Sequence, residues 1–302
     1  MAASCFSVTS LYGKFLRRSL IAAGLSSQTI DIDEQTTMHF WGPQPNSNPS
    51  SSAKPSLLLI HGFGPHHGVF QWRPQIVFFA ADFDIYVPDL VFFGHSTTTS
   101  NERSEVFQAI CVGKLMEKLG VNKYSVVGTS YGGFVAYNLA LMFPERIQKL
   151  VIANSGINMR KEDHQELLKR ANVEKVEDVM LPETSKQLKT LIKLAVYRST
   201  YMPNFVLKDM IGGMYMENRK EKMELLRGLT IGRDDTANIK PLQQDVLLIW
   251  GDHDRIFPLD KGKELKEIFG EKAWLEVIKD TSHIPQIEQA GIFNNLLKEF
   301  LA

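Results

Sequence analysis

The segment that most restricts how this 302-residue chain can fold is Gly128-Thr129-Ser130-Tyr131-Gly132-Gly133. It comes directly after the apolar stretch Tyr124–Val127 and directly before a helical pattern that ends ahead of Pro144. A G-x-S-x-G turn between a strand and a helix strains its serine and leaves no room for side chains two residues to either side. Glycine is therefore needed at 128 and 132, and Ser130 is a candidate nucleophile held out above a sheet.

Short apolar stretches alternate with helical patterns along most of the chain. Because their Val, Leu and Ile residues run on without polar interruption, they predict strands covered on both faces, as in a parallel sheet. These strands are expected at 57–60, 84–87, 124–127, 150–153, 246–250 and 274–278. A hairpin is expected at 29–33 and 36–41, and helices at 105–119, 133–143 and 292–301. The alternation favours an open, doubly wound α/β sheet.

The segment 157–241 interrupts this alternation. It contains no strand pattern, and its helical patterns fall at 161–171, 183–199, 204–210 and 218–229. Since the segment lies between two predicted buried strands, we expect an inserted helical cap over one edge of the sheet. The core domain is then formed by 29–156 and 242–302.

The charge balance narrows the choice of partner. Lysine plus arginine number 34 and aspartate plus glutamate number 34, so the formal net charge is zero. This balance provides no basic excess for nucleic acid, and an apolar small molecule is the expected ligand. Cys5 and Cys111 are too few for a disulfide framework and are interpreted as free thiols in a reducing compartment.

The first 28 residues form a basic segment of their own, with Lys14, Arg17 and Arg18 and no acid. The preferred interpretation is an amphipathic helix over 11–25 that packs on the domain or contacts a membrane surface peripherally. The serine content supports the alternative of a transit peptide. With the preferred interpretation we expect a cytoplasmic protein. If the segment is a transit peptide, the expected location is the chloroplast.

A serine nucleophile needs a base, and the base needs an orienting acid. His283 lies in the loop after the last predicted strand and before the last helix, which suits the chain order serine, acid, histidine. Three other histidines follow predicted strands too early for that order: His61, His95 and His253. Both Asp252 and Asp254 follow the strand at 246–250 and are candidate acids. Asp89 precedes Ser130 and is expected to brace its own loop.

Five motifs in matching order resemble the α/β-hydrolase superfamily. They are HGFG at 61–64, Pro88-Asp89 with Gly94-His95-Ser96, GTSYGG at 128–133, GDHD at 251–254 and SHIP at 282–285. The resemblance covers 30–302, and the basic N-terminal helix adds a likeness to plant proteins called monoacylglycerol lipase-like or epoxide hydrolase-like. It implies a mostly parallel eight-stranded sheet flanked by helices, with an inserted cap and with no cofactor or metal.

The resemblance also implies roles for individual residues. In the G-D-x-D-x-x-x-P loop of this fold the second aspartate faces the histidine, so Asp254 is expected to orient His283. The oxyanion hole is expected from the backbone N–H groups of Phe63 and Tyr131. His61 is expected to brace the Phe63 loop. Apart from the resemblance, the aromatic and methionine side chains of the cap predict an apolar pocket, and the residues expected to border the substrate are His61, Tyr197 and Met214.

The strained G-x-S-x-G turn at Ser130 is called the nucleophile elbow, and a serine at this position favours acyl transfer. The expected activity is therefore hydrolysis of a carboxylic ester of a small apolar substrate through an acyl-enzyme. Epoxide hydrolases and haloalkane dehalogenases use an aspartate at this position, which excludes their chemistry. The extended loop Gly64–Gly68 resembles that of carbon–carbon bond hydrolases, and hydroxynitrile lyases share the triad. A further alternative is a hormone-type receptor with slow or single-turnover hydrolysis, because such receptors retain the triad.

Overall fold

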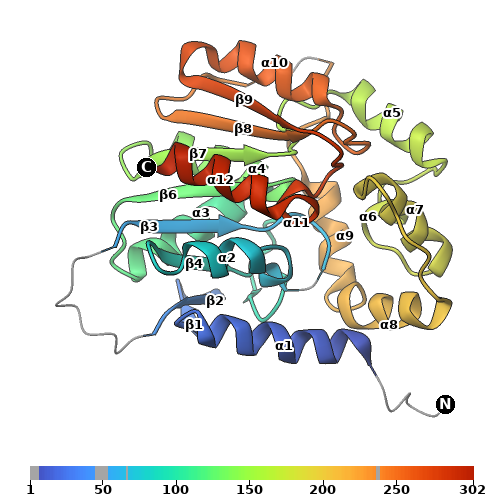
Figure 1. The fold of residues 1–302 in the computed structure, drawn as a ribbon, viewed down its shortest axis with the longest axis horizontal. Helices are drawn as coiled ribbons and strands as arrows, with labels where there is room; N and C mark the ends of the chain where they lie inside the picture. The colour runs from blue at the N-terminus through green and yellow to red at the C-terminus, as the bar shows by residue number, and fades with distance from the viewer. Residues whose placement is uncertain (1–6, 45–53, 66, 236–238) are drawn as a thin grey trace.

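The computed structural model describes residues 7–44, 54–65, 67–235 and 239–302, which include a nine-stranded sheet (Figure 1). Eight strands follow the order β1-β2-β4-β3-β6-β7-β8-β9, and the two-residue β5 pairs with β2. β1 and β2 run antiparallel to their neighbours and the strands from β4 to β9 along this path pair in parallel. The bounds are β1 Leu25–Asp31, β2 Thr36–Pro43, β3 Ser56–Ile60, β4 Asp84–Pro88, β5 Thr97–Thr98, β6 Tyr124–Thr129, β7 Ile147–Ala153, β8 Asp245–Gly251 and β9 Ala273–Ile278. The predicted mostly parallel sheet is confirmed, and the short β5 accounts for the strand beyond the expected eight.

The central strands form because their sequences are apolar on both faces. Every residue of β6 is buried, and so is every residue of β3 after Ser56. Strands of this kind need helices on both sides of the sheet. The edge strand β1 instead alternates between inner and outer residues, as a strand with one solvated face does.

Two layers of helices cover the sheet. One layer consists of α1 Val8–Ala22, α2 Arg73–Phe79 and α12 Ala290–Leu301, and the other of α3 Glu105–Lys118, α4 Tyr131–Met142 and α10 Leu259–Phe269. The first layer shares a core cluster that includes Leu20, Ile76 and Phe293. The second layer packs in a separate cluster that includes Leu115 and Phe134. Shorter helical turns are η1 Gly68–Gln71, η2 Gly270–Lys272 and α11 Pro285–Glu288.

The insertion between β7 and β8 is helical. Among its described residues, all regular secondary structure is helix and none is strand. It contains α5 Lys161–Ala171, α6 Glu177–Met180, α7 Ser185–Ala195, α8 Asn204–Met214 and α9 Arg219–Gly228. In Figure 1 these helices lie beside the end of the sheet toward which β3 points. Two contacts join α3 to the cap. The carboxylate of buried Glu105 in α3 accepts the backbone N–H of Thr230, and Arg103, in the loop before α3, forms an ion pair with Glu224 at 2.8 Å.

Two core helices were not expected from the sequence. α2 is short, and it carries apolar residues all round, from Ile76 to Phe79, so no helical period marks it. α10 contains Gly262 at an interior position, which weakens its helical pattern. The fold explains this glycine, because a Cβ there would lie 2.8 Å from the ring of Trp250.

The N-terminal helix begins three residues before its expected start and ends before Leu25, which opens β1 instead. Leu16 and Leu20 anchor it to the core, while Leu11 and Phe15 remain about half exposed. Its first turn also reaches the cap, because the backbone N–H of Thr9 donates to Asp209 in α8 at 2.8 Å. Peripheral membrane contact stays a prediction. Within the described ranges no helix combines the length and apolarity needed to cross a bilayer.

Some expectations fall on residues that the structure does not describe. Cys5 and the start of the basic segment lie in 1–6. Cys111 is buried in α3 as a free thiol, and burial raises its pKa to about 12, so it is kept as a neutral thiol.

Candidate active site

Ser130 occupies the strained turn between β6 and α4. Its φ is +54°, a region that side chains other than glycine rarely adopt. The neighbouring glycines are required by contact, since a Cβ at Gly128 would lie 2.3 Å from the carbonyl oxygen of Gly132. A Cβ at Gly132 would in turn lie 2.3 Å from the carbonyl oxygen of Ile60 in β3. These contacts agree with the sequence interpretation of the elbow.

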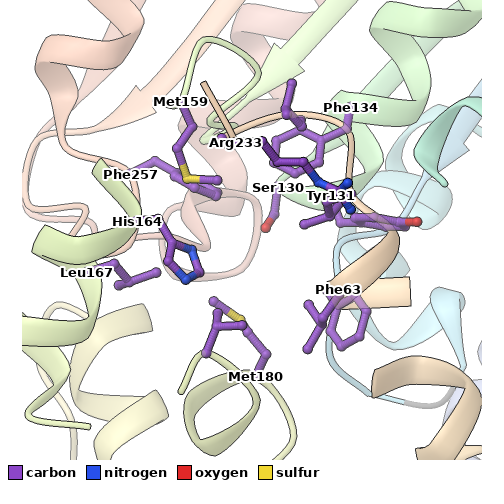
Figure 2. Close-up of a pocket in the computed structure, with 15 residues that line it drawn as sticks. Phe63, Ser130, Tyr131, Phe134, Met159, His164, Leu167, Met180, Arg233 and Phe257 are labelled. Atoms are coloured by element: carbon purple, nitrogen blue, oxygen red, sulfur yellow. The ribbon is translucent and has the colours of Figure 1, made fainter. Parts of the chain in front are cut away.

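Hydrogen bonds from the next strand hold this turn in place. The backbone N–H of Ser130 donates to the carbonyl of Ala153 at 2.9 Å. The hydroxyl of Ser155 donates to the Ser130 carbonyl at 2.7 Å. Both bonds use the main chain, so neither occupies the Ser130 hydroxyl, and in Figure 2 its oxygen points into the cavity.

His283 and Asp254 form a buried pair, with Nδ1 of the imidazole 2.9 Å from Oδ2 of the carboxylate. The other carboxylate oxygen accepts the backbone N–H groups of Ile256 and Phe257 at 2.8 and 3.0 Å. Oδ2 also accepts the side-chain amide of Asn154 at 2.6 Å. Asp254 is therefore fixed by main-chain and amide donors and presents its charge to one nitrogen of the imidazole.

The two aspartates of the GDHD loop differ in position, as the resemblance implied. Asp252 accepts the backbone N–H of Thr281 at 3.3 Å and lies 3.7 Å from His253. It therefore links two loops and leaves the contact with His283 to Asp254.

The loop after β3 passes very close to Ser130. A Cβ at Gly62 would lie 2.9 Å from the Cβ of Ser130, so only glycine permits this approach. The amide oxygen of Gln71 accepts the Gly62 N–H at 2.9 Å and fixes the loop. Phe63 and Tyr131 both line the cavity that contains Ser130, and their rings meet edge to face at 5.6 Å. The two residues expected to supply the oxyanion hole are thus brought together.

His61 braces this loop from behind. Its side chain is fully buried, Nδ1 donates to the Gly62 carbonyl at 2.8 Å, and Nε2 accepts the backbone N–H of Leu90 at 3.0 Å. Both bonds are satisfied only by the neutral imidazole, and burial lowers the pKa of His61 below its usual value. The bracing role suits this geometry, but the expected contact between His61 and the substrate does not.

The cavity beside Ser130 has a volume of about 220 Å³ and lies between the core and the cap (Figure 2). Its walls are mostly apolar side chains such as Phe134, Met159, Leu167, Met180 and Phe257. Among the described residues that line it, the basic side chains are those of His164 in α5 and Arg233, and none is a carboxylate. The cavity therefore suits an apolar molecule, with room for one anionic or carbonyl group near the cap.

Two predicted substrate contacts lie elsewhere in the cap. Tyr197 stacks on His253 with ring centroids 4.4 Å apart, and its backbone N–H donates to Glu288. Met214 packs with Leu207 and Ile211 in a separate apolar cluster of the cap. Neither residue lines the cavity at Ser130, so both assignments are corrected here. The aromatic and methionine content of the cap does not distinguish residues that face the cavity from those that fill the cap's own core.

His164 and Arg233 were missed, together with Met159 and Met180. One signal was available for His164, because it shares the inner face of α5 with Leu167 and Ala171, which are buried. A titratable group on the apolar face of an amphipathic helix is a candidate site residue. Arg233 lies in an irregular segment after α9, where no sequence period applies.

No metal site accompanies this arrangement in the part of the chain that the structure describes. There, no three His, Cys, Asp or Glu side chains are placed so that they could hold a metal ion.

The model of the α/β hydrolase fold family matches residues 55–290, most of the chain and all of the site described above. The chain belongs to the α/β hydrolase fold family. The likeness to plant lipase-like and epoxide hydrolase-like members stays a prediction.

Similar proteins include several of known activity. A 2-hydroxy-6-oxononadienedioate/2-hydroxy-6-oxononatrienedioate hydrolase of Paraburkholderia phymatum is 26% identical, over 84% of this chain and 89% of its own. A solved 2-hydroxy-6-oxo-6-phenylhexa-2,4-dienoate hydrolase from a Rhodococcus species superposes with a TM-score of 0.73 at 24% identity, covering 92% of this chain and 98% of its own. A carboxylesterase from Bacillus subtilis superposes with a TM-score of 0.72 at 18% identity, covering 97% and 98%. At these identities the solved structures establish the fold that they share with this α/β-hydrolase.

Proposed function

We propose that this α/β-hydrolase attacks a carbonyl carbon of its substrate through Ser130, with His283 as base and Asp254 as the group that orients the base. The observation that carries the proposal is the His283–Asp254 pair at 2.9 Å, together with a strained Ser130 whose hydroxyl points into an apolar cavity. Because Nδ1 of His283 faces Asp254, Nε2 is the nitrogen that takes the serine proton.

The reaction proceeds in two stages. Ser130 Oγ bonds to the carbonyl carbon and its proton passes to His283, while the backbone N–H groups of Phe63 and Tyr131 stabilise the negative oxygen. The bond to the leaving group then breaks, and the leaving group takes the proton from His283. Water, deprotonated by the same imidazole, releases the acid and restores Ser130.

The first candidate bond is a carbon–carbon bond next to a ketone. The relatives that span most of this chain are named as hydrolases of 2-hydroxy-6-oxo dienoates, whose names describe a ketone and a carboxylate in one molecule. A carbon leaving group departs only when its charge is delocalised, as it is along a conjugated dienoate. His164 and Arg233 line a cavity whose described lining residues include no carboxylate, so they can hold the distant carboxylate of such a substrate.

The second candidate is an apolar carboxylic ester. It is favoured by the apolar walls, since Phe134, Met159 and Phe257 offer dispersion contacts to an acyl chain and no specific contact to a dienoate. The catalytic steps are the same, and only the leaving group differs.

The test compares both substrate classes with the wild type, Ser130→Ala and the exposed cap variant Ser199→Ala. One assay follows the loss of 2-hydroxy-6-oxo-6-phenylhexa-2,4-dienoate, and the other follows nitrophenol release from p-nitrophenyl esters of increasing acyl length. Turnover that disappears in Ser130→Ala and persists in Ser199→Ala supports the proposal, and the faster substrate identifies the bond. A single stoichiometric burst from the folded wild type contradicts it and favours the receptor alternative.

A further inference from the structure

A second cavity lies beneath the N-terminal helix, away from Ser130. It has a volume of about 230 Å³, and its lining comes from α1, the β1–β2 hairpin, the segment 67–70 and His95. Leu16, Leu20, Trp41 and Phe70 supply apolar surface. None of its lining residues lines the cavity at Ser130. The two cavities therefore have separate walls.

The charged and polar lining of this second cavity is one-sided. Among the described residues that line it are Arg17 and the imidazoles of His39, His67 and His95, and none of the described lining residues is a carboxylate. The Arg17 guanidinium lies 5.7 Å from the ring centroid of Trp41, and no carboxylate of a described residue pairs with it. A permanent cation without an acidic partner, next to apolar walls, is the arrangement that binds an organic anion.

The carboxylate of Asp89 lies behind the imidazoles and does not line the cavity. Asp89 is fully buried behind the imidazoles, with Oδ2 2.8 Å from His39 Nδ1 and 3.6 Å from His67 Nδ1. On the cavity side, Nε2 of His39 hydrogen-bonds the hydroxyl of Ser27 at 2.8 Å. This chain of contacts places a hydroxyl and the histidine rings between the ligand space and the buried carboxylate, so a ligand in the cavity meets Arg17 and the imidazoles and not Asp89.

We propose that this cavity is a second ligand site, for a small carboxylate with an apolar body. The carboxylate pairs with Arg17 and the body packs against Trp41, Leu20 and Phe70. One permanent cation matches one negative charge, which favours a carboxylate over a doubly charged phosphate. The volume lies below the roughly 300 Å³ at which drug-sized sites begin, so the ligand is small.

The site also lies directly behind the oxyanion loop. The backbone N–H of Gly68 donates to Oδ1 of Asp89 at 2.8 Å, so the carboxylate beneath the ligand space anchors the end of the loop that carries Phe63. The proposed binding does not depend on the reaction at Ser130, and it can be tested in a protein that has no turnover.

The test uses the full chain carrying Ser130→Ala and measures benzoate binding by calorimetry, with benzamide as the neutral ligand of the same shape. Arg17→Gln is compared with Arg18→Gln, which removes the same charge from an equally exposed neighbour that does not line the cavity. Gly13→Leu is the occluding variant, because Gly13 lines the cavity and its Cβ position has no atom within 4 Å. Gly212→Leu, in an equally open position of α8, is its control.

We expect benzoate to bind and benzamide to bind at least about tenfold more weakly, a difference of about 1.4 kcal/mol. Arg17→Gln and Gly13→Leu should each weaken benzoate binding by a similar factor, while Arg18→Gln and Gly212→Leu leave it unchanged. The proposal is overturned if benzoate does not bind at about 10 mM, a concentration that detects millimolar affinity. It is equally overturned if both arginine variants weaken binding to the same extent, or if Gly13→Leu has no effect.

Discussion

The side-chain amide of Asn154 donates to Oδ2 of Asp254 at 2.6 Å, and the same oxygen lies 2.9 Å from Nδ1 of His283. Asn154 directly follows β7, it is fully buried, and its φ is +45°. Two donors therefore converge on one carboxylate oxygen, and the orientation of the acid depends on a neighbouring strand as well as on its own loop.

Asn154→Ala should lower kcat/KM about tenfold or more, because a hydrogen bond to a charged group contributes about 1.5–3 kcal/mol. Steady-state kinetics on the better substrate measures the effect. Asn158→Ala is the control, since the Asn158 amide donates to the Lys261 carbonyl at 3.1 Å, in a separate contact. Equal rates for Asn154→Ala and the wild type would show that the main-chain donors suffice to position Asp254.

Gly62→Ala should lower kcat by about 10², the effect of losing one oxyanion donor, and change the unfolding temperature little. The new methyl group would lie 2.9 Å from the Cβ of Ser130 and 3.2 Å from the Thr129 carbonyl, so the loop that carries Phe63 has to move. Gly291→Ala, where a Cβ meets no atom within 4 Å, should leave the activity intact. A fully active Gly62→Ala variant would remove this loop from the oxyanion hole.

Met180→Ala should shift the preferred acyl length toward longer p-nitrophenyl esters, because Met180 lines the cavity at Ser130 and its truncation enlarges that space. Tyr197→Ala and Met214→Ala should leave the preference unchanged, since both side chains pack away from the cavity. The ratio of kcat/KM values along the ester series gives the preference. A shift in the Tyr197 variant alone would mean that the substrate enters along a different path.

The free energy of unfolding should fall as the pH drops below about 6.5, in part because of His61. Burial keeps the folded-state pKa of His61 below its unfolded value, so the unfolded chain takes up the proton first. The stabilisation is complete above the unfolded pKa and is lost as the pH falls toward the folded one. Urea titrations between pH 5 and 7 should give a shallower pH slope for His61→Gln than for the wild type. Parallel slopes would assign the acid sensitivity to other groups.

The exposed face of α1 should bind anionic vesicles. Leu11 and Phe15 are exposed there, as are Lys14 and Arg18, which do not line the second cavity, and each basic residue near such a surface adds about 1 kcal/mol. Sedimentation with phosphatidylserine vesicles should decrease for Phe15→Asp and not for Trp274→Asp, which alters an exposed aromatic residue of β9. Binding that is insensitive to Phe15→Asp would place the contact on another surface.

The sequence by itself determined the features that depend on neighbouring residues. The elbow at Ser130, the buried strands and the helical insertion follow from glycine placement and from uninterrupted apolar runs, whose causes act within a few residues of the chain. The chain order of motifs also indicated His283 and Asp254, because the topology of this fold brings the ends of β8 and β9 together.

Only the tertiary structure decided which side chains share a cavity. Tyr197 and Met214 are of residue types common in pockets, but Tyr197 stacks on His253 and Met214 packs within the cap, while His164 and Arg233 reach the space beside Ser130. The same holds for Asn154, whose contact with Asp254 joins residues 100 positions apart. The pocket contacts depend on how the cap rests on the sheet, and the Asn154–Asp254 contact depends on the pairing of β7 with β8. Both are set by burial between segments far apart in the chain, which leaves no periodic pattern in the local sequence.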